Sequence, residues 1–149
     1  MNKTKAIIVD LDGTLSDCRS RIKYAVNKEW KEFYGRLGED EPNPYVRILV
    51  RHLQQQMSDK YEIIYLTGRP EEYRRETENW LKKYDLSADL LYMRETDDFR
   101  PDADIKLEIF NSKIKPNFNV KLVLEDRSRV VKMWRSIGLE CWQVAGGDF

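Results

Sequence analysis

The chain has 149 residues, of which 35% are charged, and its 26 basic and 26 acidic side chains give a formal net charge of zero. This balance argues against a protein that coats long nucleic acids through charge alone. No stretch approaches the ~20 apolar residues of a membrane span, and the N-terminus lacks a secretory apolar region. We therefore expect one domain over residues 1–149 without a membrane partner, in the cytoplasm, where Cys18 and Cys141 are free thiols.

Residues 6–9 form a short apolar run that predicts a strand buried on both faces, as in a parallel sheet. Asp10 and Asp12 follow, and side chains two positions apart on an extended chain point the same way. Because ligands of open α/β sheets bind beyond the carboxyl ends of strands, the two acids are expected to converge on one site. Gly13 permits a sharp turn there. An isolated Asp-Gly also fits an ordinary surface turn, but Asp-x-Asp-Gly-Thr after a buried strand favours a functional site.

A polar, basic segment at 16–21 comes next, and a helix is predicted over 20–36. This helix carries three aromatic side chains, Trp30, Phe33 and Tyr34. They either stack on a nucleic-acid base or pack the insert onto the sheet, and we favour packing. Residues 39–44 contain two prolines and predict a loop. The insert after the first strand thus covers roughly 15–45, which is too short for a separate cap domain.

Helical and strand patterns alternate along the rest of the chain. The predicted helices are 46–57, 73–84, 105–111 and 130–137, and the predicted strands are 61–66, 89–93, 120–124 and 139–144. Residues 94–104 predict irregular chain, with Asp102 or Asp104 capping the next helix, and Gly138 ends the last helix. The only histidine, His52, is expected at the surface. The alternation predicts an α/β fold, a Rossmann-like three-layer α/β/α arrangement with a central parallel sheet and a small helical insert after the first strand.

Polar side chains follow three of the predicted strands. They are Asp10 with Asp12, Thr67 to Arg69, and Glu125 with Asp126. The ends of parallel strands open on one edge of the sheet, so these groups are expected to meet there. Carboxylates in one cleft repel each other, and a hard cation such as Mg²⁺ relieves the repulsion. The Thr67 hydroxyl, the Gly68 amide and the Lys106 charge suit a transferring phosphoryl group. Taken singly, Thr67-Gly68 also fits an ordinary turn and Lys106 a solvated lysine.

These motifs, in this order, resemble those of a haloacid dehalogenase-type phosphatase. The matching residues are Asp10-Leu11-Asp12-Gly13-Thr14, Thr67-Gly68-Arg69, Lys106 and Glu125-Asp126. Residues 101–149, including the ending Gly147-Asp148-Phe149, also resemble the 3′-phosphatase domain of bacteriophage polynucleotide kinase, whereas residues 17–44 resemble it poorly. The resemblance implies that Asp10 is the nucleophile that forms an aspartyl-phosphate. It implies that Asp12 is the general acid and base, and that Asp10, the Asp12 carbonyl and Asp126 hold Mg²⁺.

The resemblance further implies that Thr67 and Lys106 hold phosphate oxygens, while Lys106 also neutralises Asp10. Substrate-binding residues are expected at Gly68, Arg69, Asp102 and Arg127, together with Arg19 or Arg21, between which the sequence does not choose. Asp102 also fits a simple helix cap. Glu125 stands where many family members have an aspartate, so we expect Asp126 to be the metal ligand and Glu125 to support it.

The resemblance implies a Mg²⁺-dependent polynucleotide 3′-phosphatase that removes terminal phosphate from DNA or RNA ends. The chain has no Gly-x-x-x-x-Gly-Lys-Ser/Thr motif for a kinase activity, so a separate kinase or ligase is the expected partner. The alternatives are a nucleotidase or other small-molecule phosphatase, and a catalytically silent binding module, which the presence of both Asp10 and Asp12 disfavours. The sequence leaves open the choice between DNA and RNA, the opening of cyclic 2′,3′-phosphates and the oligomeric state.

Overall fold

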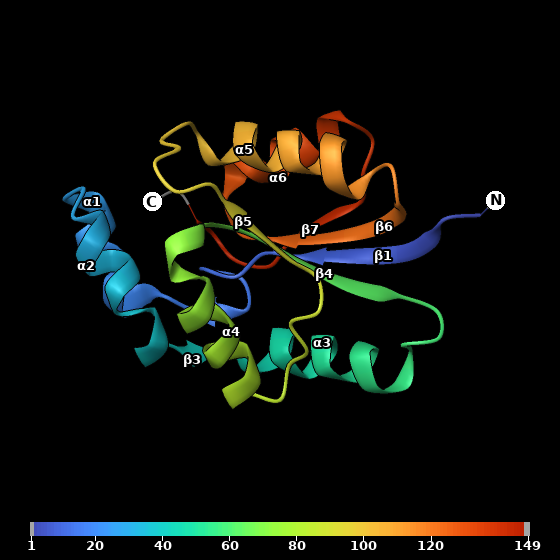
Figure 1. Cartoon of the computed structure of the whole chain (residues 1–149), viewed down its shortest axis with the longest axis horizontal. Coiled ribbons are helices and arrows are strands. Elements are labelled where there is room, and N and C mark those ends of the chain that lie inside the picture. Colours follow the sequence, from blue (N-terminus) through green and yellow to red (C-terminus); the bar gives the residue numbers. More distant parts are fainter. Residues whose placement is uncertain (1, 148–149) are drawn as a thin grey trace.

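The computed structural model describes residues 2–147, so Asp148 and Phe149 lie outside the described residues. A five-stranded sheet forms the centre of the fold, in the order β5-β4-β1-β6-β7, and every neighbouring pair is parallel (Figure 1). The strands are β1 Thr4–Val9, β4 Glu62–Pro70, β5 Leu91–Arg94, β6 Phe118–Glu125 and β7 Cys141–Gln143. Because β1 lies between β4 and β6, the carboxyl ends of these three strands come together at one edge.

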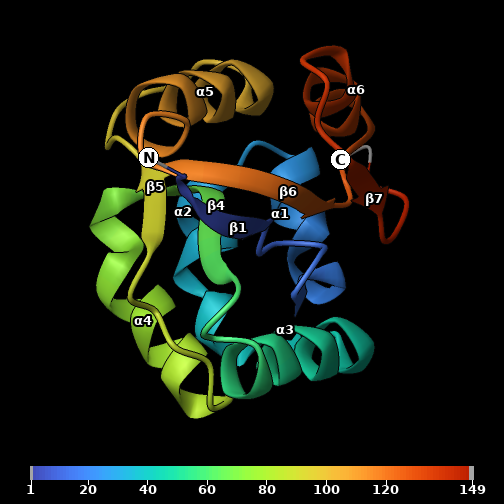
Figure 2. The same cartoon turned by 90° about the vertical axis from the view of Figure 1, so that its right-hand side faces the viewer.

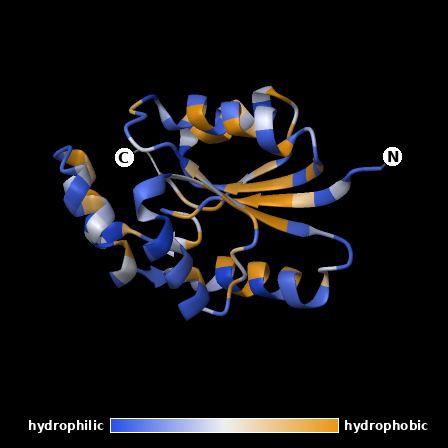
Figure 3. Cartoon of the chain, in the orientation of Figure 1, coloured by the Kyte–Doolittle hydropathy of each residue, from blue (hydrophilic) through white to orange (hydrophobic). Residues whose placement is uncertain are grey.

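Two pairs of helices cover the two faces of the sheet (Figure 2). They are α3 Pro44–Gln56 and α4 Arg74–Lys83 on one face, and α5 Asp102–Ile109 and α6 Ser128–Ser136 on the other. Strand β1 contributes side chains to a hydrophobic core on each face of the sheet. Ile7 and Val9 pack toward α3 and α4, and Ala6 and Ile8 pack toward α5 and α6. Figure 3 shows hydrophobic residues concentrated in the strands and on the inward faces of the helices. The predicted three-layer Rossmann-like fold is confirmed.

The insert after β1 is built differently from the prediction. The chain forms a short antiparallel pair, β2 Ser16–Asp17 with β3 Glu41–Pro42, and between them lie η1 Arg19–Arg21, α1 Ile22–Val26, α2 Trp30–Gly35 and η2 Leu37–Glu39. The single predicted helix over 20–36 is therefore wrong. The backbone of Lys28 has a φ of 59°, a left-handed conformation that ends one helix and allows the next to turn away.

Two further predictions about the elements need correction. Strand β4 continues to Pro70, well past the predicted end at residue 66, and carries Thr67 and Gly68 within it. Helix α5 begins at Asp102, and Pro101 occupies the N-cap position without a side-chain cap, so neither Asp102 nor Asp104 caps the helix. The Asp102 carboxylate turns toward Lys106 instead.

Other expectations hold. His52 is exposed, Gly138 follows α6 with a φ of 86°, and Cys18 and Cys141 are buried free thiols. Helix α5 runs on through η4 Phe110–Ile114, a π-helical segment. Among residues 2–147, no helix is long and apolar enough to cross a membrane.

Candidate active site

Asp10 is the first residue beyond β1, and its position is fixed by the sheet. Its amide donates to the carbonyl of Leu124 in β6 at 3.0 Å, which holds the strand end against its neighbour. One carboxylate oxygen, Oδ1, accepts from Nζ of Lys106 at 2.7 Å, and Oδ2 accepts from the hydroxyl of Thr14 at 3.0 Å. The side chain is buried but lines a cavity. Asp10 therefore presents a hydrogen-bonded carboxylate at the floor of that cavity.

Lys106 reaches Asp10 from α5 and is itself buried. Its Nζ lies 2.8 Å from Glu125 and 3.3 Å from Asp102 in addition to its contact with Asp10. Burial alone would lower the pKa of Lys106, but the charges of Asp10, Asp102 and Glu125 outweigh it and raise the pKa well above its usual value. Lys106 is therefore a fixed positive charge beside Asp10.

Asp10, Glu125 and Asp126 form a buried acidic cluster, with one carboxylate oxygen from each within 4.8 Å of the others. Burial, followed by the nearby Asp10 charge, raises the pKa of Asp126 to about 7 and that of Glu125 well above its usual value. Glu125 uses Oε2 to bind Lys106 and Oε1 to accept from the amides of Asp126 and Arg127. Its two oxygens are thus engaged in the protein, which suits a supporting position behind Asp126.

Two glycines make room for the Asp126 carboxylate. A Cβ atom built at Gly13 would lie 2.1 Å from Asp126 Oδ2, and one built at Gly147 would lie 2.0 Å from it. Gly13 also has a φ of 86°, as the predicted sharp turn requires. No pattern in the sequence indicates this role of Gly147, because only the folded chain brings it against Asp126. The close fit, the mutual repulsion of the carboxylates and their hard oxygen donors suit a divalent cation of the Mg²⁺ type.

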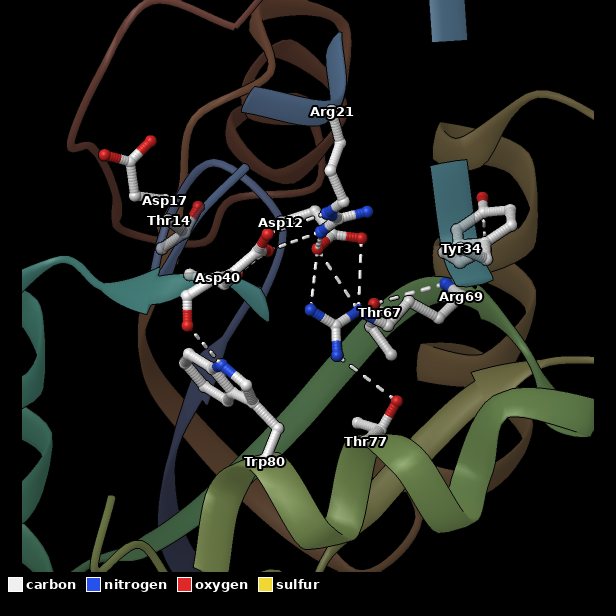
Figure 4. Close-up of polar contacts among 12 residues, drawn as sticks. Asp12, Thr14, Asp17, Arg21, Tyr34, Asp40, Thr67, Arg69, Thr77 and Trp80 are labelled. Carbon is white, nitrogen blue, oxygen red and sulfur yellow. Dashed lines mark hydrogen bonds and ion pairs between the residues drawn. The ribbon is translucent and has the colours of Figure 1, made fainter. Parts of the chain in front are cut away.

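Asp12 lies on the other side of the turn and is held by two arginines (Figure 4). Arg69 binds it through Nε and Nη2, the latter at 2.7 Å, and Nη2 of Arg21 also lies 2.7 Å from it. Burial opposes the ionisation of Asp12, but the two guanidinium charges prevail and hold its pKa well below the usual range. Arg19 instead pairs with Asp17 and its side chain is 85% exposed. Of the two candidate arginines, the structure therefore brings Arg21 to Asp12.

Asp40 anchors Arg21 from the insert and was missed by the sequence analysis. Its carboxylate accepts from Nε of Arg21 at 2.8 Å and from the hydroxyl of Ser16, and all three side chains are buried. Its backbone carbonyl accepts from Nε1 of Trp80 in α4 at 2.9 Å (Figure 4). No local motif marks Asp40, because its partners come from β2, η1 and α4. The ion pairs of Arg21 with Asp40 and with Asp12 therefore link the insert to the acidic turn.

Gly68 lets α5 come close to β4. A Cβ at Gly68 would lie 2.4 Å from Oδ1 of Asp102, and its carbonyl accepts from Nε of Arg94 at 2.8 Å. Arg94 also donates to the carbonyls of Asp98 and Arg100, at 2.9 and 2.7 Å, so it ties the loop at 95–101 to β4. The sequence analysis did not single out Arg94, whose partners are backbone carbonyls with no motif of their own.

Thr67 lies on β4, where its buried hydroxyl accepts from the amide of Arg69 at 3.2 Å. Arg69 is buried as well, and its Nη1 donates to the hydroxyl of Thr77 in α4 at 3.2 Å. Arg127 stands across from them, with a guanidinium nitrogen 4.0 Å from Asp102. These side chains surround the acidic cluster with hydrogen-bond donors and positive charge.

A cavity of about 520 Å³ opens over this cluster. The predicted site residues that line it are Asp10, Asp12, Thr67, Gly68, Asp102, Asp126 and Arg127. Lys106, Arg21 and Arg69 are buried beside it and contact its lining residues Asp10 and Asp12, whereas Arg19 points away to Asp17. Of the insert aromatics, Phe33 is buried as packing requires, while Trp30 is 44% exposed, and both line the cavity together with Tyr34. The structure therefore gathers the groups predicted from three strand ends at one concave site.

Comparisons with known proteins agree with this geometry. Residues 4–149 match the family described as the polynucleotide kinase PNKP phosphatase domain. A putative bifunctional polynucleotide kinase/RNA ligase of Autographa californica nuclear polyhedrosis virus is 32% identical over 134 residues, which are 89% of this chain and 18% of the viral protein. A chain in the solved Pnkp1/Rnl/Hen1 RNA repair complex is 40% identical with a TM-score of 0.86, over 99% of this chain and 44% of that one.

The chain thus spans less than half the length of these two relatives. The class C acid phosphatase of Bacillus anthracis, solved with tungstate bound, shares the fold at 15% identity, with a TM-score of 0.64 over 85% of this chain and 53% of that one. Because the family match covers nearly the whole chain and the motifs lie together around one cavity, the chain belongs to the polynucleotide kinase PNKP phosphatase domain family and is a phosphatase of the haloacid dehalogenase type.

Proposed function

We propose that residues 1–149 act as one domain that removes the terminal 3′-phosphate from nucleic acid ends, with Mg²⁺ as cofactor. The observation that carries this proposal is the pairing at Asp10. One carboxylate oxygen is bound by the buried charge of Lys106, and the other shares the Thr14 hydroxyl with Asp126. This arrangement supports a carboxylate that attacks a phosphoryl group at the floor of an open cavity.

In the first step, an oxygen of Asp10 forms a bond to phosphorus while the bond from phosphorus to the 3′ oxygen breaks. Asp12, as the carboxylic acid, gives its proton to the leaving oxygen, which becomes the 3′ hydroxyl. Thr67 and Lys106 hold the oxygens of the phosphoryl group. The product of this step is an aspartyl-phosphate on Asp10.

In the second step, water attacks the phosphorus of the aspartyl-phosphate and the bond to Asp10 breaks. The Asp12 carboxylate takes the proton from the water, so inorganic phosphate leaves and both side chains return to their starting states. The arginines hold the pKa of Asp12 well below its usual range, so Asp12 donates a proton only after moving away from Arg21 and Arg69. Substrate phosphates that bind these arginines would take the place of the Asp12 carboxylate and so free Asp12 from them.

Asp10, Asp126 and the backbone carbonyl of Asp12 are proposed to hold the Mg²⁺ ion, with Glu125 supporting Asp126 from behind. When bound, the ion neutralises charge on the phosphoryl oxygens and on the attacking carboxylate. The raised pKa values of Asp126 and Glu125 support this assignment, because burial and the Asp10 charge disfavour three ionised carboxylates without a cation.

The relatives support a nucleic acid substrate. The viral protein is described as a polynucleotide kinase/RNA ligase, and the structural neighbour belongs to an RNA repair complex. The short insert leaves the cavity open, which suits a strand end. We further propose that the phosphatase works with a kinase or ligase, because one relative is described as a kinase/ligase and the other belongs to a repair complex.

A substrate panel tests the proposal. Phosphate release is measured from 3′-phosphorylated DNA and RNA oligonucleotides, 5′-phosphorylated oligonucleotides and 3′ and 5′ mononucleotides, each with Mg²⁺ or with a chelator. We expect 3′ ends to be the best substrates and the chelator to abolish release, with the Asp10→Asn variant as the inactive control. Faster hydrolysis of mononucleotides than of every 3′ end would identify a nucleotidase and contradict the proposal.

A further inference from the structure

The cavity is larger than a phosphoryl group requires. Its volume of about 520 Å³ falls in the range of sites that hold a nucleotide-sized ligand. Asp10, Thr67 and Asp126 contribute polar groups to its lining. Aromatic side chains from α2, η3 Glu71–Tyr73 and the 95–101 loop line it as well, together with charged residues of the same elements such as Lys31 and Asp98. The cavity therefore offers aromatic surface in addition to the groups of the phosphate site.

Three aromatic rings of the cavity lining pack against one another in series. Trp30 and Tyr34 of α2 have ring centroids 6.2 Å apart and planes inclined by 25°, and Tyr34 and Tyr73 have centroids 5.4 Å apart and planes inclined by 35°. The Tyr34 hydroxyl donates to the carbonyl of Gly68 at 3.4 Å, which connects the three rings to the strand that carries Thr67. The rings thus form one aromatic cluster that lines the cavity beside Gly68.

Trp30 and Tyr34 both pack edge-on against Phe33, with ring centroids 5.9 and 5.0 Å from its own. Phe33 of the same helix is 3% exposed and lies under the Arg21 guanidinium, 4.4 Å from ring centroid to Cζ. Trp30 is 44% exposed although it lines the same cavity. Trp30 therefore contacts the packed Phe33 and still leaves much of its surface exposed.

The cavity is also lined by Phe99, which is among the most exposed of the large hydrophobic residues, at 85%. The loop that bears it is held in place, because Arg94 binds the carbonyls of Asp98 and Arg100 on either side of Phe99 and that of Gly68 on β4. An exposed ring on a tethered loop is a surface that a ligand can cover.

We propose that Trp30, Tyr34 and Phe99 form a nucleobase subsite, which stacks on the base of the nucleotide that carries the scissile phosphate. The inference rests on the proposed function and deepens it. A planar base is the part of a phosphorylated strand end that matches near-parallel rings, and stacking on aromatic side chains accepts any base. Lys31 and Arg127 line the same cavity and provide positive charge for the adjoining backbone.

Two substrates and three variants test this subsite. The substrates are a 3′-phosphorylated oligonucleotide with an ordinary terminal nucleotide and the same oligonucleotide with a terminal tetrahydrofuran residue, which lacks a base. We expect Trp30→Ala to raise KM for the first substrate roughly tenfold and to leave KM for the second and kcat for both unchanged. Phe99→Ala, at a more exposed position, is expected to act in the same direction. Tyr45→Ala is the control, since Tyr45 is 81% exposed on α3 and does not line the cavity.

Equal KM values for the two substrates with the wild-type chain would overturn the subsite, as would an equal loss on both substrates in the Trp30→Ala variant. These outcomes differ from a failure of the proposed function, which would show as a preference for mononucleotides or for 5′ ends. In that case, the dependence on a base is measured with the preferred phosphate ester and with the corresponding sugar phosphate that lacks the base.

Discussion

Replacing Asp40 by asparagine removes the charge that holds Arg21 in the insert. The Asp40 side chain is fully buried and Arg21 is 1% exposed, so the pair has no solvent to replace the lost charge. Arg21 keeps two other acceptors, Asp12 at 2.7 Å and the carbonyl of Phe33 at 2.7 Å. The variant therefore leaves a buried cation partly, and not wholly, unpaired.

Breaking a buried ion pair by removing one partner costs about 3–5 kcal/mol, and the remaining acceptors place this variant near the lower end. For a chain of about 150 residues, each kcal/mol lowers the unfolding midpoint by about 2–4 °C, so we expect a decrease of about 6–12 °C. We also expect a lower kcat, because Arg21 no longer has a fixed position from which to bind a substrate phosphate.

Thermal unfolding followed by circular dichroism measures the midpoint, and phosphate release measures kcat. Asp17→Asn is the matched control, since Asp17 makes a comparably short pair with Arg19 whose side chain is 85% exposed. Exposed pairs contribute little, so the control should unfold at the wild-type midpoint. An Asp40→Asn midpoint equal to that of the control would refute the reasoning that burial makes the Asp40 pair essential.

Three further predictions concern the acidic site. Gly147→Ala places a Cβ against Asp126 and should weaken Mg²⁺ binding about 10- to 100-fold in calorimetry. The control is Gly146→Ala, which has open space around its Cβ and should bind Mg²⁺ with the wild-type affinity. Equal Mg²⁺ affinities of the two variants would contradict the close fit. Asp12→Asn should lower kcat about 100- to 10,000-fold in steady-state assays with the circular dichroism spectrum retained, and an unchanged kcat would exclude Asp12 as the acid. The pKa of Asp126 without a metal is raised to about 7, so Mg²⁺ binding should release a proton below that pH and should weaken as pH falls. Calorimetry in buffers with different ionisation heats measures this proton release. The absence of any release would show that Asp126 is not a ligand.

The parts of this fold set by neighbouring residues could be predicted from the sequence. The apolar run at 6–9, the helical stripes of α3 and α6 and the acidic turn at Asp10 and Asp12 each depend on local order. The insert could not be predicted in the same way. Its strands have two residues each, too few for any periodicity, and the break between α1 and α2 occurs at Lys28, a residue type that does not mark left-handed backbone.

Three residues of the candidate site could not be recognised from the sequence, and they share one reason. Asp40 and Arg94 act through partners that are distant in sequence or are backbone carbonyls, so no spacing marks them. Gly147 matters because Asp126 approaches it closely, which its own backbone conformation does not reveal. The acids and Lys106 could be found because family motifs contain them, whereas the groups that position them depend on the tertiary structure.

Trapping the phosphoryl group tests the central claim most directly. Enzyme and an oligonucleotide with a radiolabelled 3′-phosphate are mixed with Mg²⁺, quenched in acid within one turnover and digested for peptide mapping. We predict transient label on the peptide that contains Asp10 and none in the Asp10→Asn variant. Turnover without labelled protein at any time, or label on another residue, would contradict attack by Asp10.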